Sequence, residues 1–458
     1  MFKPVAKPRI AALGLSLPLY AEALPGLIKT MQRQLQAFVA EVAPHADVAS
    51  SKLCYQHEQV AEGVAQAEAD GVDALLVVPL SYTASLMSLQ PLVRTKLPLV
   101  IWNTQEALEF GEDYDFDALA KNHVTQGTQD VTNALCRSGR VFGMESGHYQ
   151  DAAALAKLGD WLAAARAFRA AHALRVGILG APFQDMGDFG VDTTLMASRW
   201  GPYVVQLSVA RFVELMKQVP DEELLKMAAC DREQFEVAAD LDEDTHRKSL
   251  AAEWALRQIV AQDRLDAFTM NFLDLMADGR CEVMPLYAVN KLMADGMGYA
   301  GEGNVTIAAH SAQMRQLCGQ ANFTEIYTLD YQRNRMMMTH MQECNPALAR
   351  RDRKVRLIKK PFWAPGIAPY VGMHFTLEPG PVTLTNLTTD AQGRFHYIAY
   401  ESRIVDMPPL PRLDVPHWVV ALDEPVGDFL TRYSCAGGTH HLVSVPGHRA
   451  DALRKLAQ

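Results

Sequence analysis

The sequence predicts an α/β protein with two Rossmann-like parallel-sheet domains followed by an antiparallel β-rich C-terminal domain. Short apolar runs alternate with helical patterns over the first ~320 residues, as they do in βαβ units. This alternation begins again after an alanine-rich helical stretch at 152–174. Beyond ~330 the apolar residues recur with period two, which is typical of antiparallel strands.

The first predicted domain covers residues 1–168. Its expected strands and helices alternate along the chain: strands at 9–15, 46–50, 72–80 and 97–103, helices at 24–42 and 57–70. The start, "KPRIAALGLSLPLYAEA", has basic residues, an apolar centre and an A-x-A-like end, as signal peptides have. We interpret it as a first strand that runs into a loop, because a helix follows and the cysteine usage is cytosolic. Ligands of such sheets bind beyond the carboxyl ends of the strands, here at 78–83 and 102–105.

The second predicted domain covers residues 169–322 and the third covers 323–458. In the second, the expected elements are strands at 175–180 and 266–272, a loop at 181–189, a glycine-rich turn at 298–304 and a helix at 305–317. In the third, residues 374–406 alternate apolar and polar side chains, and "PGP" and "DAQG" supply the turns. These signals predict antiparallel hairpins.

Composition limits the classes of function. The chain has 458 residues, 49% of them apolar, and a formal net charge of −10, which argues against a nucleic-acid-binding protein. We interpret the one basic run, "RRDRKVRLIKK" (350–360), as a solvated connector rather than an anion site. Seven cysteines without a CxxC pair suit free thiols in the cytoplasm, and no apolar stretch is long enough to span a membrane.

Common catalytic motifs are absent, so the candidates for chemistry are scattered acids and imidazoles. Glu302 lies between two glycines and is either exposed on a turn or functional, whereas Glu325 interrupts an apolar strand-like run. His340 follows a methionine-rich run, where a hydrogen-bonded core histidine is the usual outcome. His440 and His441 are adjacent, and neighbours in a strand point to opposite faces, so one cleft would normally take one of them as a direct ligand, with the other nearby.

Together these side chains form an oxygen-plus-imidazole set. Such a set suits Mn²⁺ and related divalent ions with open positions for substrate oxygens, and its carboxylates could also move protons. Composition and spacing do not bring the residues together in space.

Five ordered blocks give the chain a family resemblance. They are "SGHYQD" (146–151), "GYAGEG" (298–303), "FTEIYTLDY" (323–331), "THMQECNPALA" (339–349) and "CAGGTHHLVS" (435–444). In order and spacing they resemble the L-arabinose isomerase family, within the broader fucose/arabinose isomerase group. The match is strong from ~298 onward, fair from ~140 and weak before ~130.

The resemblance implies an intramolecular oxidoreductase that interconverts an aldose and a ketose through a cis-enediol. It places the metal ligands at Glu302, Glu325, His340 and His441, so that the C-terminal domain carries part of the metal site. The two glutamates would also be the catalytic acid/base pair, and His440 would contact the substrate. The implied cofactor is Mn²⁺ or another divalent cation such as Co²⁺ or Mg²⁺.

The substrate-binding positions match the family less well. Met186 and Phe272 fall on positions that face the sugar. Leu17, in "LSLPLYA", stands where the family usually has a glutamine in "GSQxLYG", and Gln126 stands where it has a histidine supplied by a neighbouring subunit. Both changes alter hydrogen bonding to the distal hydroxyls, so we expect a sugar other than L-arabinose.

Two alternatives remain open beside the isomerase. The same metal site could serve an epimerase, and loss of the N-terminal polar residues would also fit a non-catalytic sugar-binding or regulatory paralogue. A purely structural role for the acids and histidines is disfavoured by the five ordered blocks. By resemblance we expect a cytoplasmic homo-oligomer, a hexamer or a tetramer, whose partner is a small sugar rather than a nucleic acid or a membrane.

Overall fold

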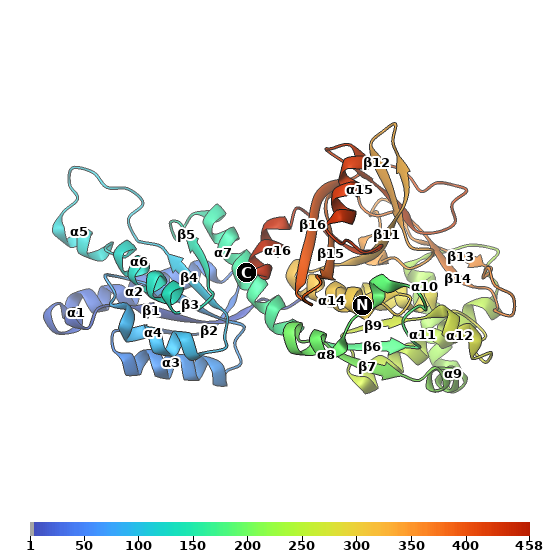
Figure 1. The fold of residues 1–458 in the computed structure, drawn as a ribbon, viewed down its shortest axis with the longest axis horizontal. Helices are drawn as coiled ribbons and strands as arrows, with labels where there is room; N and C mark the ends of the chain where they lie inside the picture. Colours follow the sequence, from blue (N-terminus) through green and yellow to red (C-terminus); the bar gives the residue numbers. More distant parts are fainter. Residues whose placement is uncertain (1–3) are drawn as a thin grey trace. The chain divides into compact units, whose positions relative to one another are not determined.

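The computed structural model describes residues 4–458. The chain forms two compact units, one built from Ala6–Arg169 with Ala452–Gln458 and the other from Ala170–Asp451. The predicted division into three domains stays a prediction, because the central and C-terminal segments belong to one of these units. The predicted fold class is confirmed: parallel α/β sheets precede an antiparallel β structure (Figure 1).

The N-terminal unit is a parallel sheet with the strand order β2-β1-β3-β4-β5. Its strands are β1 (Arg9–Leu15), β2 (Asp47–Cys54), β3 (Ala74–Pro79), β4 (Leu99–Asn103) and β5 (Gly143–Ser146). Its helices are α1 (Pro18–Ala23), α2 (Pro25–Val42), α3 (His57–Ala69), α4 (Ser85–Arg94), α5 (Phe116–Lys121), α6 (Thr125–Arg137), α7 (Ala152–Ala171) and α16 (Ala450–Ala457). Every residue of β3 is buried, as expected for a central strand with helices on both faces of the sheet.

Two sequence expectations for this unit can be compared with the structure. The signal-like N-terminal stretch is strand β1, as interpreted, but the following residues form α1 instead of a loop, with Pro18 at the favoured first helical position. Residues 103–105 of the expected ligand region line a cavity of about 250 Å³ beyond the carboxyl ends of β4 and β5.

The second unit begins with a parallel sheet in the order β10-β9-β6-β7. Its strands are β6 (Arg175–Leu179), β7 (Tyr203–Leu207), β9 (Ala267–Met270) and β10 (Gly298–Gly301). Its helices are η1 (Gly187–Phe189), α8 (Thr193–Leu195), η2 (Met196–Trp200), α9 (Val209–Lys217), α10 (Asp221–Gln234), α11 (Glu243–Asp263), α12 (Phe272–Ala277), α13 (Leu286–Ala294) and α14 (Val305–Cys318). The turn expected at 298–304 is therefore shorter, because its first four residues form the buried strand β10. The glycine and alanine residues of β10 are small enough for α14 to pack closely against the strand. A Cβ added at Gly298 would fall only 2.6 Å from the Ala308 carbonyl oxygen.

The C-terminal strands close into an antiparallel barrel in the order β11-β12-β17-β16-β15-β18. They are β11 (Asn322–Asp330), β12 (Arg335–Thr339), β15 (Gly380–Thr389), β16 (Phe395–Ile404), β17 (His417–Ala421) and β18 (His441–Pro446), with η3 (Pro346–Leu348) and α15 (Val426–Cys435) in the connections. Closure of the sheet pairs β11 with both β12 and β18.

A further small sheet corrects the interpretation of the basic run. It joins β14 (Tyr370–His374), β13 (Arg356–Lys360) and β8 (Glu236–Val237). Half of the run at 350–360 is thus strand β13 rather than a connector, and its Leu357 is fully buried. Its charged side chains face solvent and pair with acids, as Lys359 does with Asp242 at 2.6 Å.

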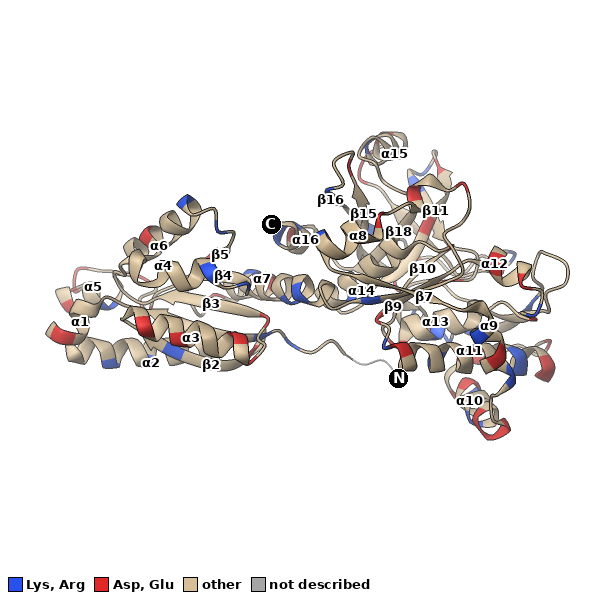
Figure 2. Ribbon diagram, turned by 60° about the horizontal axis from the view of Figure 1, so that its bottom comes forward, with Lys and Arg blue, Asp and Glu red and all other residues tan. Residues whose placement is uncertain are grey.

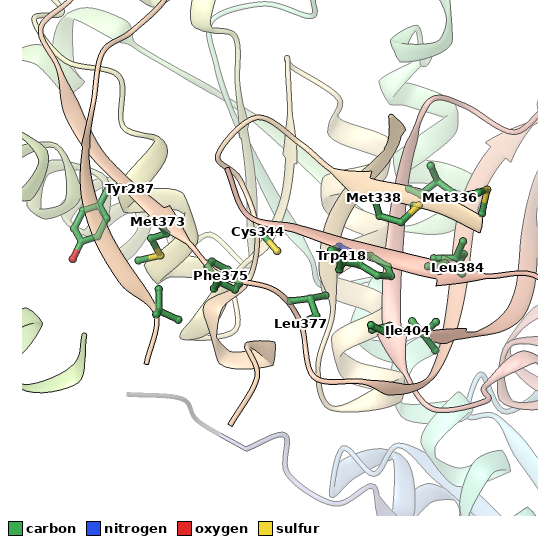
Figure 3. Packing of buried hydrophobic residues seen from close by; sticks show 14 of the residues in the cluster. Tyr287, Met336, Met338, Cys344, Met373, Phe375, Leu377, Leu384, Ile404 and Trp418 are labelled. Atoms are coloured by element: carbon green, nitrogen blue, oxygen red, sulfur yellow. The ribbon is translucent and has the colours of Figure 1, made fainter. Parts of the chain in front are cut away.

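One apolar cluster packs the barrel against the helices of the same unit. In Figure 3, Met336 and Met338 of β12 lie beside Trp418 and Leu384, while Tyr287 of α13 lies at the other end of the cluster. Alternate residues of β12 share one face, so the methionine-rich run fills the barrel core. This packing gives the strands that carry the candidate site a rigid support.

The distribution of surface charge and the hydropathy of the helices agree with the composition. Basic and acidic residues are scattered over the helices in Figure 2, and α10 opens with the acids Asp221, Glu222 and Glu223. Within residues 4–458, no helix is long and apolar enough to cross a membrane. The thiols of Cys54, Cys281 and Cys344 are buried and form no disulfide.

Candidate metal and active site

Glu302 occupies a strained turn directly after β10. Its φ is +62°, a region that residues other than glycine rarely adopt and that clusters at functional sites. Gly301 leaves room for His340, since a Cβ there would lie 3.0 Å from the imidazole Cε1. Gly303 has φ +81°, and a Cβ there would fall 2.6 Å from the Ala181 carbonyl oxygen. Both glycines are therefore needed to hold the Glu302 carboxylate in place.

Glu325 and His441 are brought together by strand pairing in the barrel. Glu325 on β11 is directly opposite His441 on β18. The His441 side chain is 0% exposed, and its Nε2 lies 3.0 Å from Glu325 Oε1 and 3.7 Å from Glu302 Oε2. Burial, with the neighbouring imidazoles, lowers the pKa of His441 well below its usual value. His441 is thus held as a neutral imidazole, the form that binds metals.

His340 follows β12 and is held by a buried carboxylate. Its Nδ1 lies 2.7 Å from Glu343 Oε2, and its Nε2 lies 3.5 Å from Glu325 Oε1. Tyr299 donates a hydrogen bond to the other oxygen of Glu343 at 3.0 Å. Burial opposes the charged form of His340, but Glu343 and the other carboxylates outweigh it and raise its pKa to about 9. Glu343 thereby directs Nε2 of His340 toward the glutamates.

His440 approaches the same glutamates from the residue before β18. Its Nε2 lies 3.6 Å from Glu325 Oε1 and 3.9 Å from Glu302 Oε2. The carboxylates of Glu302 and Asp188 raise the pKa of His440, although desolvation opposes them. The sequence predicts one of the adjacent histidines as a direct ligand with the other nearby, and both lie beside the glutamates, because the strand begins at His441 and the preceding backbone brings His440 to the same point. Which of the two would bind a metal stays a prediction.

The donor set suits a divalent cation. Ligand atoms of Glu302, Glu325, His440 and His441 all lie within 4.8 Å of one another. The buried Nε2 of His441 has no hydrogen-bond partner among the described residues, despite its short distance to Glu325. An unpartnered imidazole nitrogen facing two carboxylates is what a site for a hard or borderline cation requires. His340 is absent from this tight group, although its Nε2 also faces Glu325.

The expected substrate-contacting residues fall into two groups. The first group is Met186 and Phe272, in the same unit as the glutamates. Met186 lies in the loop before η1 and is 40% exposed. The Phe272 ring lies 5.8 Å from that of Phe183, and the backbone N–H of Phe183 donates a hydrogen bond to the Glu302 carbonyl at 2.9 Å. Leu17, which caps α1, and Gln126, exposed on α6, belong to the N-terminal unit. Their roles stay predictions.

Sequence reasoning did not single out Glu343 or Asp188. Glu343 follows His340 by three residues within the quoted block "THMQECNPALA", which places it within hydrogen-bond reach. Asp188 lies in the quoted loop "APFQDMGDF", but its partner His440 is 252 residues away in sequence. No local pattern could have joined the two.

Two protein-family models match most of the second unit. The L-arabinose isomerase central domain matches residues 191–320, and the L-arabinose isomerase C-terminal domain matches residues 320–458. Together the two matches cover more than half of the chain. The chain belongs to the L-arabinose isomerase family. The family of aldose–ketose isomerases suggested by the sequence blocks is thereby confirmed.

Full-length relatives agree with the family models. The chain is 28% identical over 395 residues to an L-arabinose isomerase of Nocardioides sp., which covers 82% of this chain and 77% of the relative. An L-arabinose isomerase of Klebsiella pneumoniae is 24% identical over 452 residues, which covers 95% of this chain and 89% of the relative. A solved sugar-binding protein of Actinobacillus succinogenes has a TM-score of 0.17, too low to support an argument.

The candidate site of this L-arabinose isomerase family member lies across the boundary between the two matched domains. Glu302 belongs to the central-domain match, whereas Glu325, His340, His440 and His441 belong to the C-terminal match. The parallel sheet and the barrel therefore each contribute one of the two glutamates.

Proposed function

We propose that the chain is a metal-dependent aldose–ketose isomerase that acts on a small sugar through a cis-enediol. The observation that carries the proposal is the convergence of Glu302 and Glu325 on three imidazoles. The two side chains are only 18% and 15% exposed, so both carboxylates are partly desolvated and still open to a ligand. Partial desolvation strengthens their electrostatic action on a bound substrate.

Four residues would hold the cation. Glu302, Glu325 and His441 are common to the sequence prediction and to the tight group of donors. We assign His340 as the fourth ligand, because Glu343 holds its Nδ1 and leaves Nε2 for the metal, the usual arrangement of a ligating histidine. The proposed ion is Mn²⁺, or another divalent cation such as Co²⁺ or Mg²⁺. When bound, it would polarise the carbonyl and the adjacent hydroxyl of the sugar.

The two glutamates would transfer the proton. One carboxylate removes the C–H proton next to the carbonyl, and the electron pair of that bond forms the C=C bond of the enediol. The π pair of the carbonyl moves onto its oxygen, which takes a proton from the second carboxyl group. In the second half of the reaction the other hydroxyl of the enediol returns a proton to that carboxylate and becomes the new carbonyl, while the C=C electron pair takes the first proton, or one exchanged with solvent, at the former carbonyl carbon. Atoms and electrons balance, since aldose and ketose are isomers. A base within hydrogen-bond reach of the substrate can contribute 10²–10⁴-fold to such a step.

We propose a sugar other than L-arabinose, in a cytoplasmic homo-oligomer. Leu17 and Gln126 support the altered specificity, because an apolar group and an amide replace the polar partners expected from the family. Sites that pair polar groups with hydroxyls reject mismatched sugars strongly. The resemblance, which assigns the position of Gln126 to a neighbouring subunit, supports the oligomer.

A sugar panel in D₂O tests the function. Metal-free protein is reloaded with Mn²⁺, and aldoses and ketoses of four to six carbons are followed by NMR. Deuterium at C1 or C2 together with a new carbonyl isomer would support the isomerase. Deuterium with inversion of one centre and no carbonyl shift would indicate an epimerase. Bound Mn²⁺ without exchange in any sugar would contradict catalysis and favour the sugar-binding paralogue.

Two variants test whether the exchange depends on the glutamates of the site. Glu325→Gln should abolish exchange, because the amide cannot accept the proton. Glu401→Gln is the matched control, since Glu401 is also a barrel glutamate beside an imidazole, 4.0 Å from His448 Nδ1, but lies outside the site. Equal loss of exchange in both variants would show that the effect is not specific to the site.

A further inference from the structure

One carboxylate makes two contacts with His440. Asp188 Oδ2 lies 2.6 Å from the His440 Nδ1 and accepts the backbone N–H of His440 at 3.2 Å. A carboxylate is only an acceptor, so the hydrogen must be on Nδ1 of the imidazole. Asp188 thereby occupies Nδ1 and leaves Nε2 as the ring nitrogen available to the site.

Nε2 of His440 faces the centre of the proposed active site. Nε2 of His440 lies between the two glutamates, 3.6 Å from Glu325 and 3.9 Å from Glu302. With Nδ1 bound on the opposite side of the ring, rotation of the imidazole about its terminal bond would break the contact with Asp188. The terminal torsion of histidine is otherwise broad and has no single preferred value.

The turn that carries Asp188 also packs against both histidines. Phe189, the next residue of η1, is 1% exposed, and its ring lies 5.0 Å from that of His440 and 4.7 Å from that of His441. Burial of Phe189 fixes the turn, so the position of the Asp188 carboxylate is set by packing rather than by a mobile loop.

His440 and His340 share one arrangement but differ in access. Glu343 binds Nδ1 of His340 as Asp188 binds Nδ1 of His440. The His340 side chain is 6% exposed, whereas that of His440 is 37% exposed. Access of this kind suits contact with a substrate hydroxyl more than permanent ligation.

We propose that Asp188 is a positioning residue that holds His440 with Nε2 directed at a hydroxyl group of the substrate. The inference rests on the proposed function for its substrate. Asp188 itself does not touch the reacting atoms, and it acts through the imidazole. Carboxylates that orient a functional histidine in this way commonly contribute 10- to 100-fold.

A kinetic cycle with His440 tests this role. Asp188→Ala should lower kcat/KM roughly 10- to 100-fold in the wild type. In a His440→Gln background the same change should have an effect below about twofold, because no imidazole remains to be positioned. Asp188→Asn should keep more activity than Asp188→Ala, since the amide oxygen can still accept from Nδ1. An equal effect of Asp188→Ala in both backgrounds would overturn the proposal.

A matched control separates positioning from damage to the loop. Asp192 is a second carboxylate of this segment and caps α8 by accepting the backbone N–H groups of Thr194 and Leu195. Asp192→Ala should change kcat/KM by the same factor with His440 or with glutamine at that position. Coupling of Asp192 to His440 as strong as that of Asp188 would contradict a specific role.

Crystal structures of the metal-free variants give a readout that does not depend on activity. In Asp188→Ala the His440 ring should rotate or lose order, and in Asp188→Asn it should stay in place. An unmoved ring in Asp188→Ala would overturn the proposal. If no sugar is turned over by the wild type, the proposed function fails, while the ring position still decides whether Asp188 orients His440.

Discussion

Replacing Lys291 with methionine should lower the free energy of unfolding of the 170–451 unit by about 3–5 kcal/mol, the usual cost of breaking a buried ion pair. The Lys291 ammonium lies 2.8 Å from Asp231 Oδ1 and 2.8 Å from Glu253 Oε2, and these carboxylates are 0% and 2% exposed. Desolvation opposes the charge of Lys291, but the two acids outweigh it and raise its pKa. Asp231 and Glu253 keep partners in Tyr287 and Arg257, so the loss is one cation rather than the whole network.

Differential scanning calorimetry measures the effect. A change of this size should lower the Tm of the transition by on the order of 10 °C, at about 2–4 °C per kcal/mol for a unit of this size. Lys226→Met is the matched control, because Lys226 also contacts two carboxylates, Glu222 at 2.9 Å and Glu223 at 3.1 Å, but is 60% exposed. Exposed pairs contribute about 0–1 kcal/mol. Equal Tm shifts for the two lysine variants would refute the reasoning.

Four further predictions concern the site and the barrel. Glu302→Gln should abolish turnover while leaving the Tm within a few degrees, and near-normal kcat would remove Glu302 from the proton-transfer pair. His441→Ala should reduce Mn²⁺ bound per subunit, measured by electron paramagnetic resonance, and unchanged occupancy would exclude it as a ligand. Gly303→Ala should lower the free energy of unfolding by about 1–3 kcal/mol and remove most of the activity, because alanine is strained at φ +81° and its Cβ meets the Ala181 backbone. A fully active and equally stable variant would show that the turn does not require glycine at this position. Burial lowers the pKa of His310 to about 3, so below pH 6.5 the unfolded chain takes up a proton that the native state does not. The free energy of unfolding should therefore fall by about 1.4 kcal/mol per pH unit as the pH is lowered from 6.5 to 3. If the urea midpoints of His310→Gln and wild type changed with pH in parallel, His310 would not be the origin of the pH dependence.

The regular elements were predictable because their signals are local. The run at 74–80 is continuously apolar, as a central parallel strand must be, and the structure places β3 there. Closure of the barrel was not predictable, since it depends on pairing β11 with β18, more than 100 residues apart in sequence. The strand β13 was missed because its arginine and two lysines obscure the apolar pattern around the one fully buried side chain, Leu357.

The candidate site was predictable only through the family resemblance. The sequence shows Glu302 between glycines, yet nothing local says that its φ is positive or that it meets Glu325. Strand geometry predicts one of the adjacent histidines as a direct ligand with the other nearby, but it does not show that both rings face the glutamates, as they do because His440 precedes the strand. The contact between Asp188 and His440 was also not predictable, because two residues so far apart in sequence produce no local pattern.

The division of the site between β10 and the barrel has a consequence for recombining members of the family. A chimera joined near residue 320, where the central-domain match ends, would take Glu302 from one parent and Glu325, His340 and His441 from the other. Both halves of such a hybrid could fold, yet the turn that carries Glu302 would come from one parent and its partners from the other. A small difference between the parents in the position of that turn would displace the Glu302 carboxylate from Glu325 and the histidines. A crossover placed before β6 would instead transfer every donor together, along with the loop that holds them.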